Sequence, residues 1–217
     1  MEIDLLKNYP KPKRDLEARV QSKTLEQQKI ARKFEEEFFD GDRDHGYGGF
    51  YYNPRFWQPV IPSFQKHWNI KSGESLLDIG CAKGFMLHDF NEIIPGLELQ
   101  GIDISNYAIK NGIDSMRDQL QVASADKLPF EDNRFDYAIS ITTIHNFDKD
   151  GVIKALKEIE RVTKQGSFIT VDAYRNDLEK ERMFAWNLTA KTILHVDEWK
   201  ELFIEAEYTG DYFWFMP

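Results

Sequence analysis

Cysteine is nearly absent from this 217-residue chain, which has only Cys81. A single thiol can form neither an intramolecular disulfide nor a cysteine metal cluster, so both kinds of site are excluded. Long apolar runs are also missing. No stretch approaches the ~20 residues that span a bilayer, and the charged first residues lack an apolar core of signal-peptide length. We therefore expect a cytoplasmic protein without a membrane partner.

Positive charge is in short supply. The chain has 28 lysines and arginines against 37 aspartates and glutamates, which gives a formal net charge of −9 and a pI near 5.1. Proteins that track a phosphate backbone usually carry a basic face, so we expect no nucleic-acid partner. The charged fraction of 30% and the apolar fraction of 41% are those of an ordinary globular domain with a proper core.

The stretch of residues 75–90 organises the chain. It reads as a buried strand, a turn of small residues with the pattern Asp78-x-Gly80-x-x-x-Gly84, and a helix that opens at Phe85. The backbone N–H groups of such a turn face a ligand. A dinucleotide fingerprint needs a third glycine where Phe85 stands, and Asp78 would repel a pyrophosphate. The turn instead suits a ligand with ammonium and hydroxyl donors, although an NAD-dependent oxidoreductase stays as an alternative.

A second acid follows at the end of the next predicted strand, residues 97–104. Asp103 lies 23 residues after Gly80, where an acid can accept hydrogen bonds from both ribose hydroxyls. Ser105 could cap the helix after it. Further strands are predicted at residues 120–123, 135–141 and 167–173, with an amphipathic helix at 149–164 that Gln165 and Gly166 stop. This alternation predicts an α/β, Rossmann-like, mostly parallel sheet with helices on both faces.

The predicted domains are an N-terminal extension at residues 1–70 and a ligand-binding domain at 71–217. In the extension we expect a loosely held tail or strap at 1–13, one or two amphipathic helices within 14–40, and a helix at 59–69. Residues 40–57 hold four glycines and many aromatic rings. They could form an aromatic lid over the ligand, or they could fill the core of the domain.

Four features in order resemble the class I S-adenosylmethionine-dependent methyltransferases. They are the turn at 78–84, Asp103, the Leu128-Pro129-Phe130 stretch and the segment 158–166, and together they cover residues 76–173. The branch they resemble, methyltransferase type 11-like, acts mostly on small molecules. In that family the segment around Ser124 and Ala125 meets the adenine. Ser124 replaces the usual acid there and could still bond the adenine amine, and Asp126 could serve in its place.

The resemblance implies S-adenosyl-L-methionine as the cofactor. The residues predicted to bind it are Tyr47, Asp78, Gly80, Cys81, Ala82, Gly84, Asp103, Ile104, Ser124, Ala125 and Ser140. We expect methyl transfer to oxygen or nitrogen of a small-molecule acceptor by in-line displacement. The acceptor would lie under the N-terminal lid and the segment after the fifth strand.

One histidine is the candidate general base. His145 follows the predicted strand 135–141 and could remove a proton from the acceptor, or it could only shape the loop. No metal is predicted, because Asp172 stands alone where the ligands of metal-dependent relatives cluster. The Asn/Asp-Pro-Pro-aromatic turn of base-methylating enzymes is missing at residues 140–143, which again disfavours nucleic acid.

The end of the chain leaves one alternative open. Helices are predicted at 176–189 and 197–206, but only about one strand's worth of sequence, 208–215, follows them. The family usually ends in a two-strand hairpin. A cofactor-binding subunit without catalysis is therefore the other hypothesis. The identity of the acceptor and the oligomeric state are left open, with a dimer as one option.

Overall fold

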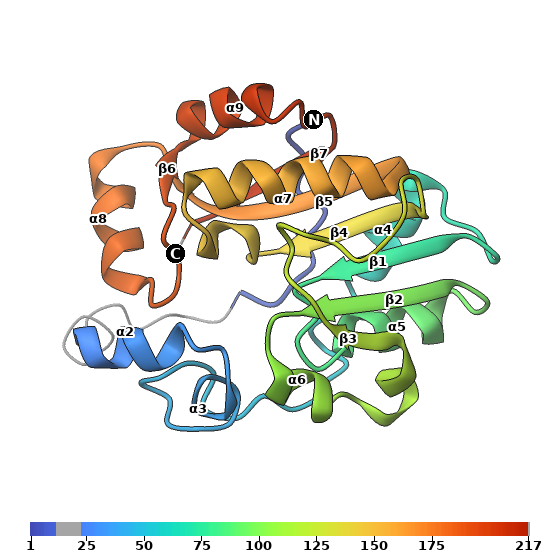
Figure 1. The fold of residues 1–217 in the computed structure, drawn as a ribbon, viewed down its shortest axis with the longest axis horizontal. Helices are drawn as coiled ribbons and strands as arrows, with labels where there is room; N and C mark the ends of the chain where they lie inside the picture. The colour runs from blue at the N-terminus through green and yellow to red at the C-terminus, as the bar shows by residue number, and fades with distance from the viewer. Residues whose placement is uncertain (12–22, 217) are drawn as a thin grey trace.

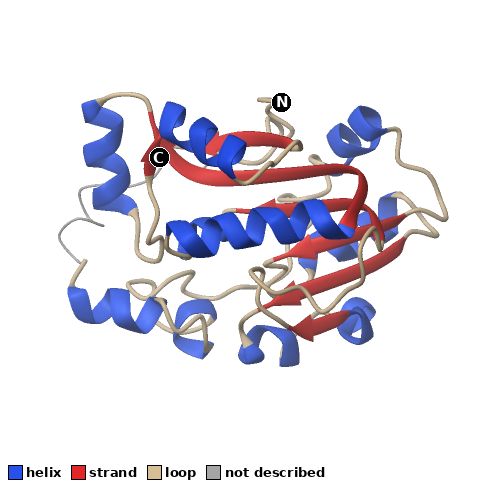
Figure 2. Cartoon of the chain, turned by 45° about the horizontal axis from the view of Figure 1, so that its top comes forward, coloured by secondary structure: helices blue, strands red, loops and turns tan. Residues whose placement is uncertain are grey.

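The protein is built around one sheet with helices on both of its faces. The structure, a computed structural model, describes residues 1–11 and 23–216. The seven-stranded sheet has the order β3-β2-β1-β4-β5-β6, and β7 also pairs with β5. Every strand pair in it is parallel. Figures 1 and 2 show helices on either side of the strands, which confirms the predicted Rossmann-like α/β fold.

The predicted strands and helices occur in the predicted order, and one two-residue strand, Leu194–His195, was not predicted. The strands are β1 (Ser75–Ile79), β2 (Glu98–Asp103), β3 (Leu120–Val122), β4 (Phe135–Ile141), β5 (Thr163–Tyr174), β6 (Leu194–His195) and β7 (Asp211–Phe215). The α-helices are α2 (Leu25–Ala31), α3 (Glu36–Phe39), α4 (Ile61–Trp68), α5 (Phe85–Ile93), α6 (Asn106–Lys110), α7 (Lys149–Val162), α8 (Asp177–Trp186) and α9 (Val196–Glu205). Short 3-10 helices are η1 (Asp114–Gln119) and η2 (Ile144–Asn146). Among these, no helix is both long and apolar enough to cross a lipid bilayer.

Alternate residues of β1 serve two hydrophobic cores. Leu76 packs with Phe64 of α4 and with α5, whereas Leu77 and Ile79 pack beneath α7 and α9. Because successive side chains of a strand point to opposite faces, a strand covered on both sides needs apolar residues throughout. This explains why β1 reads as one apolar run that only Asp78 interrupts.

Helix ends are set by local side chains and by packing. The Ser105 hydroxyl accepts a bond of 2.9 Å from the N–H of Ala108, which confirms the predicted cap of α6. The predicted stop at Gln165 and Gly166 is wrong, because α7 ends at Val162 and β5 begins at the next residue. Gly166 instead gives room to the Trp68 indole, which a Cβ would meet at 2.9 Å.

The C-terminal part of the described chain holds one strand after α9, as expected from its length. β7 runs parallel to β5, and β6 is only two residues long. Residues 1–3 lie beside β7, where the N–H of Ile3 donates to the Tyr212 carbonyl at 3.0 Å. Leu5 is only 4% exposed. Of the two expected forms, a tail or a strap, residues 1–11 form a strap, but it is packed and not loosely held, while 12 and 13 lie outside the described residues.

The N-terminal extension is helical, as predicted, in the part that the structure describes. α2 and α3 lie within the predicted range of 14–40, whereas residues 14–22 are outside the described chain. α4 belongs to the core of the sheet, because Phe64 is fully buried against Phe90 and Phe168. The division of the chain at residue 70 stays a prediction.

Candidate cofactor-binding site

The glycine turn between β1 and α5 brings three strand ends together. The N–H groups of Gly80 and Cys81 both donate to the Ile102 carbonyl of β2, at 2.8 and 2.9 Å. Gly80 has φ +85° and lies against Thr143, whose Oγ1 would be 2.0 Å from a Cβ at this position. Only glycine adopts this backbone without strain and leaves the space that Thr143 fills. The turn is therefore fixed to β2 on one side and to the end of β4 on the other.

Ala82 has an unusual backbone for a residue with a side chain. Its φ is +50°, and Gly84, which precedes α5, has φ +77°. A left-handed conformation is uncommon outside glycine and is held here by the surrounding contacts. The N–H of Ala82 donates to Asp103 at 2.9 Å, so the strained residue points its amide at the second acid.

Asp103 lies across the mouth of the turn. It is 8% exposed, one carboxylate oxygen accepts from the N–H of Ala82 and the other from that of Ser105 at 2.8 Å. Burial raises its pKa, and these backbone bonds oppose the shift. A carboxylate has about four acceptor sites, so Asp103 keeps capacity for the hydroxyl donors of a ligand while the backbone fixes its orientation.

Asp78 is a buried acid that accepts no hydrogen bond from the described part of the chain. It is 3% exposed, and burial, followed by the negative charge of Asp103, raises its pKa well above the usual range. The same two acids, after burial, raise the pKa of the Cys81 thiol, which stays protonated. Two neighbouring acids without a cation between them fit a ligand that carries positive charge and hydroxyl donors, as S-adenosylmethionine does.

The predicted adenine side has an apolar shelf and a polar pair. Ile104 directly follows Asp103 and is 54% exposed, whereas Ala125 is buried. The Ser124 hydroxyl donates to the carboxylate of Asp126. Asp126 is thus held beside Ser124, and its role in place of the usual acid stays a prediction.

Ser140 lies behind the turn. Its hydroxyl donates to the Ile79 carbonyl at 3.1 Å and is buried, so it joins β4 to β1. Its predicted contact with the cofactor would have to use the remaining acceptor capacity of Oγ. That contact stays a prediction.

His145 is a buried, neutral imidazole. Its Nδ1 accepts from the N–H of Asp172 at 3.0 Å, so the ring proton of the neutral form lies on Nε2. Burial lowers the pKa of His145, and the carboxylate of Asp172 opposes that shift. The side-chain amide of Asn187 donates to Oδ2 of the Asp172 carboxylate. The structure therefore places the predicted base in a polar group with Asp172 and Asn187, in which Nδ1 already has a donor.

Tyr47 lies among aromatic rings near the second acid. Its ring is 4.4 Å from Phe50 and also packs with Phe38 and Phe39. Desolvation, with Asp103 among the charges that add to it, raises the pKa of the Tyr47 phenol, although 45% of the residue is exposed. The structure thus brings Tyr47 to the same side of the sheet as the glycine turn.

Two features of this region were not predicted. Lys83 of the turn pairs with Asp40, and Asp172 forms the polar group with His145 and Asn187. The partners in each group come from distant segments, so no local spacing could have indicated them. A lysine within a turn of small residues is the one signal that the sequence did offer.

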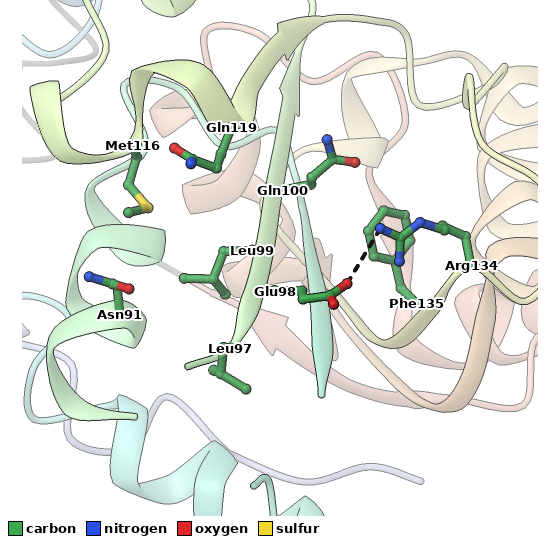
Figure 3. A pocket seen from close by; sticks show the side chains of 9 residues that line it. All are labelled: Asn91, Leu97, Glu98, Leu99, Gln100, Met116, Gln119, Arg134 and Phe135. Atoms are coloured by element: carbon green, nitrogen blue, oxygen red, sulfur yellow. Dashed lines mark ion pairs between the residues drawn. The ribbon is translucent and has the colours of Figure 1, made fainter. Parts of the chain in front are cut away.

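A separate pocket lies at the opposite ends of the strands (Figure 3). It measures about 320 Å³ and is lined by side chains such as Glu98 and Phe135, the first residues of β2 and β4. Arg134 and Glu98 form an ion pair of 3.6 Å beside it. None of the predicted site residues lines this pocket, so it is distinct from the site at the carboxyl ends.

The chain is similar to methyltransferases in sequence and in fold. Residues 77–171 match the model of a methyltransferase domain. A tRNA (carboxymethyluridine(34)-5-O)-methyltransferase of Arabidopsis thaliana is 32% identical over 144 residues, which cover 65% of this chain and 33% of that protein. The sterol 24-C-methyltransferase of Schizosaccharomyces pombe is 33% identical over 133 residues, 55% of this chain and 34% of that protein.

A solved structure supports the fold. The YcgJ protein from Bacillus subtilis superimposes with a TM-score of 0.55 at 22% identity, covering 67% of this chain and 66% of that one. The chain spans about a third of the length of the two sequence relatives above. The matched segment contains β1, the glycine turn, Asp103 and β4, which are the parts that build the site. Residues 77–171, the part of the chain that carries the site, therefore resemble a methyltransferase domain.

Proposed function

We propose that this protein transfers a methyl group from S-adenosyl-L-methionine to an oxygen or nitrogen atom of a small-molecule acceptor. The observation that carries the proposal is the pair of acids around the glycine turn. Asp78 and Asp103 are both buried, and neither has a cationic partner in the described chain, while the methyltransferases that residues 77–171 resemble use a cationic cofactor.

The residues of the chain would bind and orient the cofactor. Asp103 would accept hydrogen bonds from the ribose hydroxyls. The carboxylate of Asp78 would attract the positive charge of the cofactor. Gly80, Cys81, Ala82 and Gly84 would offer backbone to the ligand, and Ile104 with Ala125 would flank the adenine. When bound, the cofactor supplies an activated methyl group, so the remaining tasks of the protein are alignment and exclusion of water.

The acceptor would lie between the N-terminal extension and the segment after β5. The guanidinium of Arg32, just after α2, donates to the carbonyls of Thr189 and Ala190 at 3.2 and 3.3 Å. α2 thus reaches the connection between α8 and β6 (Figure 1). The relatives act on tRNA and on sterols by their names. The net charge of −9 favours a small molecule over a nucleic acid here.

His145 stays the proposed base for acceptors that must lose a proton. Its lowered pKa keeps the imidazole neutral at physiological pH, which is the form a base needs. Accepting the acceptor's proton on Nδ1 would require the bond from the Asp172 N–H to open first. The cytoplasmic location and a dimeric state also stay predictions.

Calorimetry and methyl-transfer assays test the function. We expect the wild-type protein to bind S-adenosyl-L-methionine and not NAD, and to methylate at least one member of a panel of amines, phenols, carboxylates and sugars. A transcript pool of tRNA forms the other arm of the panel. Transfer to tRNA alone would refute the small-molecule acceptor, and binding without any transfer would favour a non-catalytic subunit. Absence of binding would refute the proposal as a whole.

Replacing Asp78 by asparagine tests what its negative charge does for stability and for cofactor binding. The raised pKa means that the folded apo protein gains stability from the bound proton and loses it as pH rises through that pKa. D78N should therefore melt at a higher temperature than wild type near neutral pH. It should also bind S-adenosyl-L-methionine about tenfold more weakly, because roughly 1.4 kcal/mol of charge attraction is lost.

The affinity for S-adenosyl-L-methionine should depend on pH in one direction. A cationic ligand favours the ionised carboxylate, so wild-type affinity should rise with pH through the raised pKa of Asp78 and then level off. That part of the dependence should vanish in D78N. Calorimetry across pH and thermal melts without cofactor measure the two effects. A D78N protein with wild-type affinity at every pH would show that the acid does not face the ligand.

A further inference from the structure

Lys83 is a charged residue inside the glycine turn, and its side chain is buried. Its Nζ lies 2.5 Å from the carboxylate of Asp40, and only 7% of the lysine and 17% of the aspartate side chain are exposed. Nζ also donates to the Phe50 carbonyl at 3.0 Å. The turn at 80–84 is therefore connected to a segment that lies more than thirty residues earlier in the chain.

Asp40 gathers several bonds at one point. One carboxylate oxygen accepts from the N–H of Phe50 at 2.8 Å, and the other accepts from Lys83 and from the Tyr107 hydroxyl at 2.7 Å. Burial would raise the pKa of Asp40, but these bonds outweigh it and lower the pKa. Asp40 is thus ionised and joins the start of the aromatic segment, residues 40–52, to the turn and to α6.

The aromatic segment covers the flanks of the proposed cofactor site. The Phe50 ring lies 5.0 Å from that of Phe85, the first residue of α5, and the Tyr107 hydroxyl of α6 donates to Asp40 at 2.7 Å. Within the segment, the Tyr47 ring lies 4.4 Å from that of Phe50. The segment therefore packs on both helices that follow the two ligand-binding strand ends.

We propose that Lys83 is a positioning residue for the cofactor, acting through Asp40 to hold the aromatic segment closed over the site. This inference rests on the proposed function. With the pair intact, the aromatic segment limits exchange of the cofactor and the entry of water. Opening the pair frees the segment, and bound cofactor then leaves more quickly.

The energetics of a buried pair explain why the effect is large. Removing one partner leaves the other charge buried and unpaired, which is strongly unfavourable in the closed state. In the open state the remaining charge can reach water. The substitution should therefore destabilise the closed state of the aromatic segment and leave the stability of the sheet unchanged. Loop segments of this kind open on the microsecond to millisecond timescale, fast enough to gate a ligand.

The variant K83M and its matched control K164M test the inference. Lys164 forms an exposed pair of 3.6 Å with Asp136 at the start of β5, far from the carboxyl ends of the strands. Stopped-flow fluorescence would follow the dissociation of S-adenosyl-L-homocysteine. We expect at least tenfold faster dissociation in K83M and no change in K164M. Y107F, which loses one bond to Asp40 and keeps the ion pair, should show a smaller increase.

Hydrogen exchange without ligand gives a readout that does not depend on the cofactor. Amides of residues 40–52 should exchange faster in K83M and D40N, while those of β1 and β4 keep wild-type protection. The inference would be overturned if S-adenosyl-L-homocysteine left K83M at the wild-type rate. A rise in hydrogen exchange spread evenly over the sheet would overturn it as well. Should K83M fail to fold, D40N and Y107F decide by the same criteria. Failure of the wild type to bind the ligand would instead refute the proposed function.

Discussion

Replacing Gly80 by alanine is expected to destabilise the protein by about 2–5 kcal/mol and to abolish measurable binding of S-adenosyl-L-methionine. The left-handed backbone costs a residue with a side chain about 1–2 kcal/mol. The new Cβ would also lie 2.0 Å from Thr143 Oγ1, and such overpacking adds about 1–3 kcal/mol. The turn can relieve the overlap only by moving away from β4, which displaces the N–H groups that the ligand would meet.

Gly73 provides the matched control for this substitution. It has nearly the same backbone, φ +88° against +85°, but nothing lies within 4 Å of its missing Cβ. G73A should therefore lose only the stability that a left-handed backbone costs a residue with a side chain, about 1–2 kcal/mol. Its affinity for S-adenosyl-L-methionine should stay that of the wild type. Urea unfolding measures the stability and calorimetry the affinity. Equal losses of stability in G80A and G73A would show that the contact with Thr143 does not matter.

Asp103→Ala should weaken the binding of S-adenosyl-L-methionine by roughly 1–3 kcal/mol, or roughly 5- to 150-fold in Kd. The ribose hydroxyls would lose their acceptor. The N–H groups of Ala82 and Ser105 would lose theirs as well, which loosens the turn. D103N, which keeps one acceptor oxygen, should fall between alanine and wild type.

The control for charge is Asp118→Ala, an exposed acid in η1. It changes the net charge of the protein by the same amount and should leave Kd unchanged. Calorimetry at one pH and one salt concentration compares the three variants with wild type. An affinity of D103A within twofold of wild type would contradict the assignment of this carboxylate to the ribose.

The parallel sheet and much of the site could be predicted because the signals are local. A strand buried on both faces is mostly apolar, and β1 and β4 read that way. A tight turn into a helix needs glycine, which placed Gly80 and Gly84 correctly. Asp103 follows from its position at the end of the next strand. These features depend on residues close in sequence or on a fixed spacing.

The remaining features depend on contacts between distant segments. Residues 1–3 carry no strand pattern, and their pairing with β7 arises only once the sheet exists. Gly166 looked like a helix stop, but its place in β5 is set by the Trp68 indole. The bond between Lys83 and Asp40, like that between His145 and Asp172, joins residues that no periodicity relates. Charge and polarity alone could not show which of many possible partners would meet.

The N-terminal extension touches the molecule on both sides of the strand ends, through Asp40 at the glycine turn and through Arg32 at the connection after α8. A body that bridges two ligand sites links their equilibria. If the proposed acceptor site is coupled to the cofactor site through this extension, thermodynamic reciprocity requires each ligand to change the affinity for the other by the same factor. Because that factor is the same in both directions, either ligand would prepare the molecule for the other.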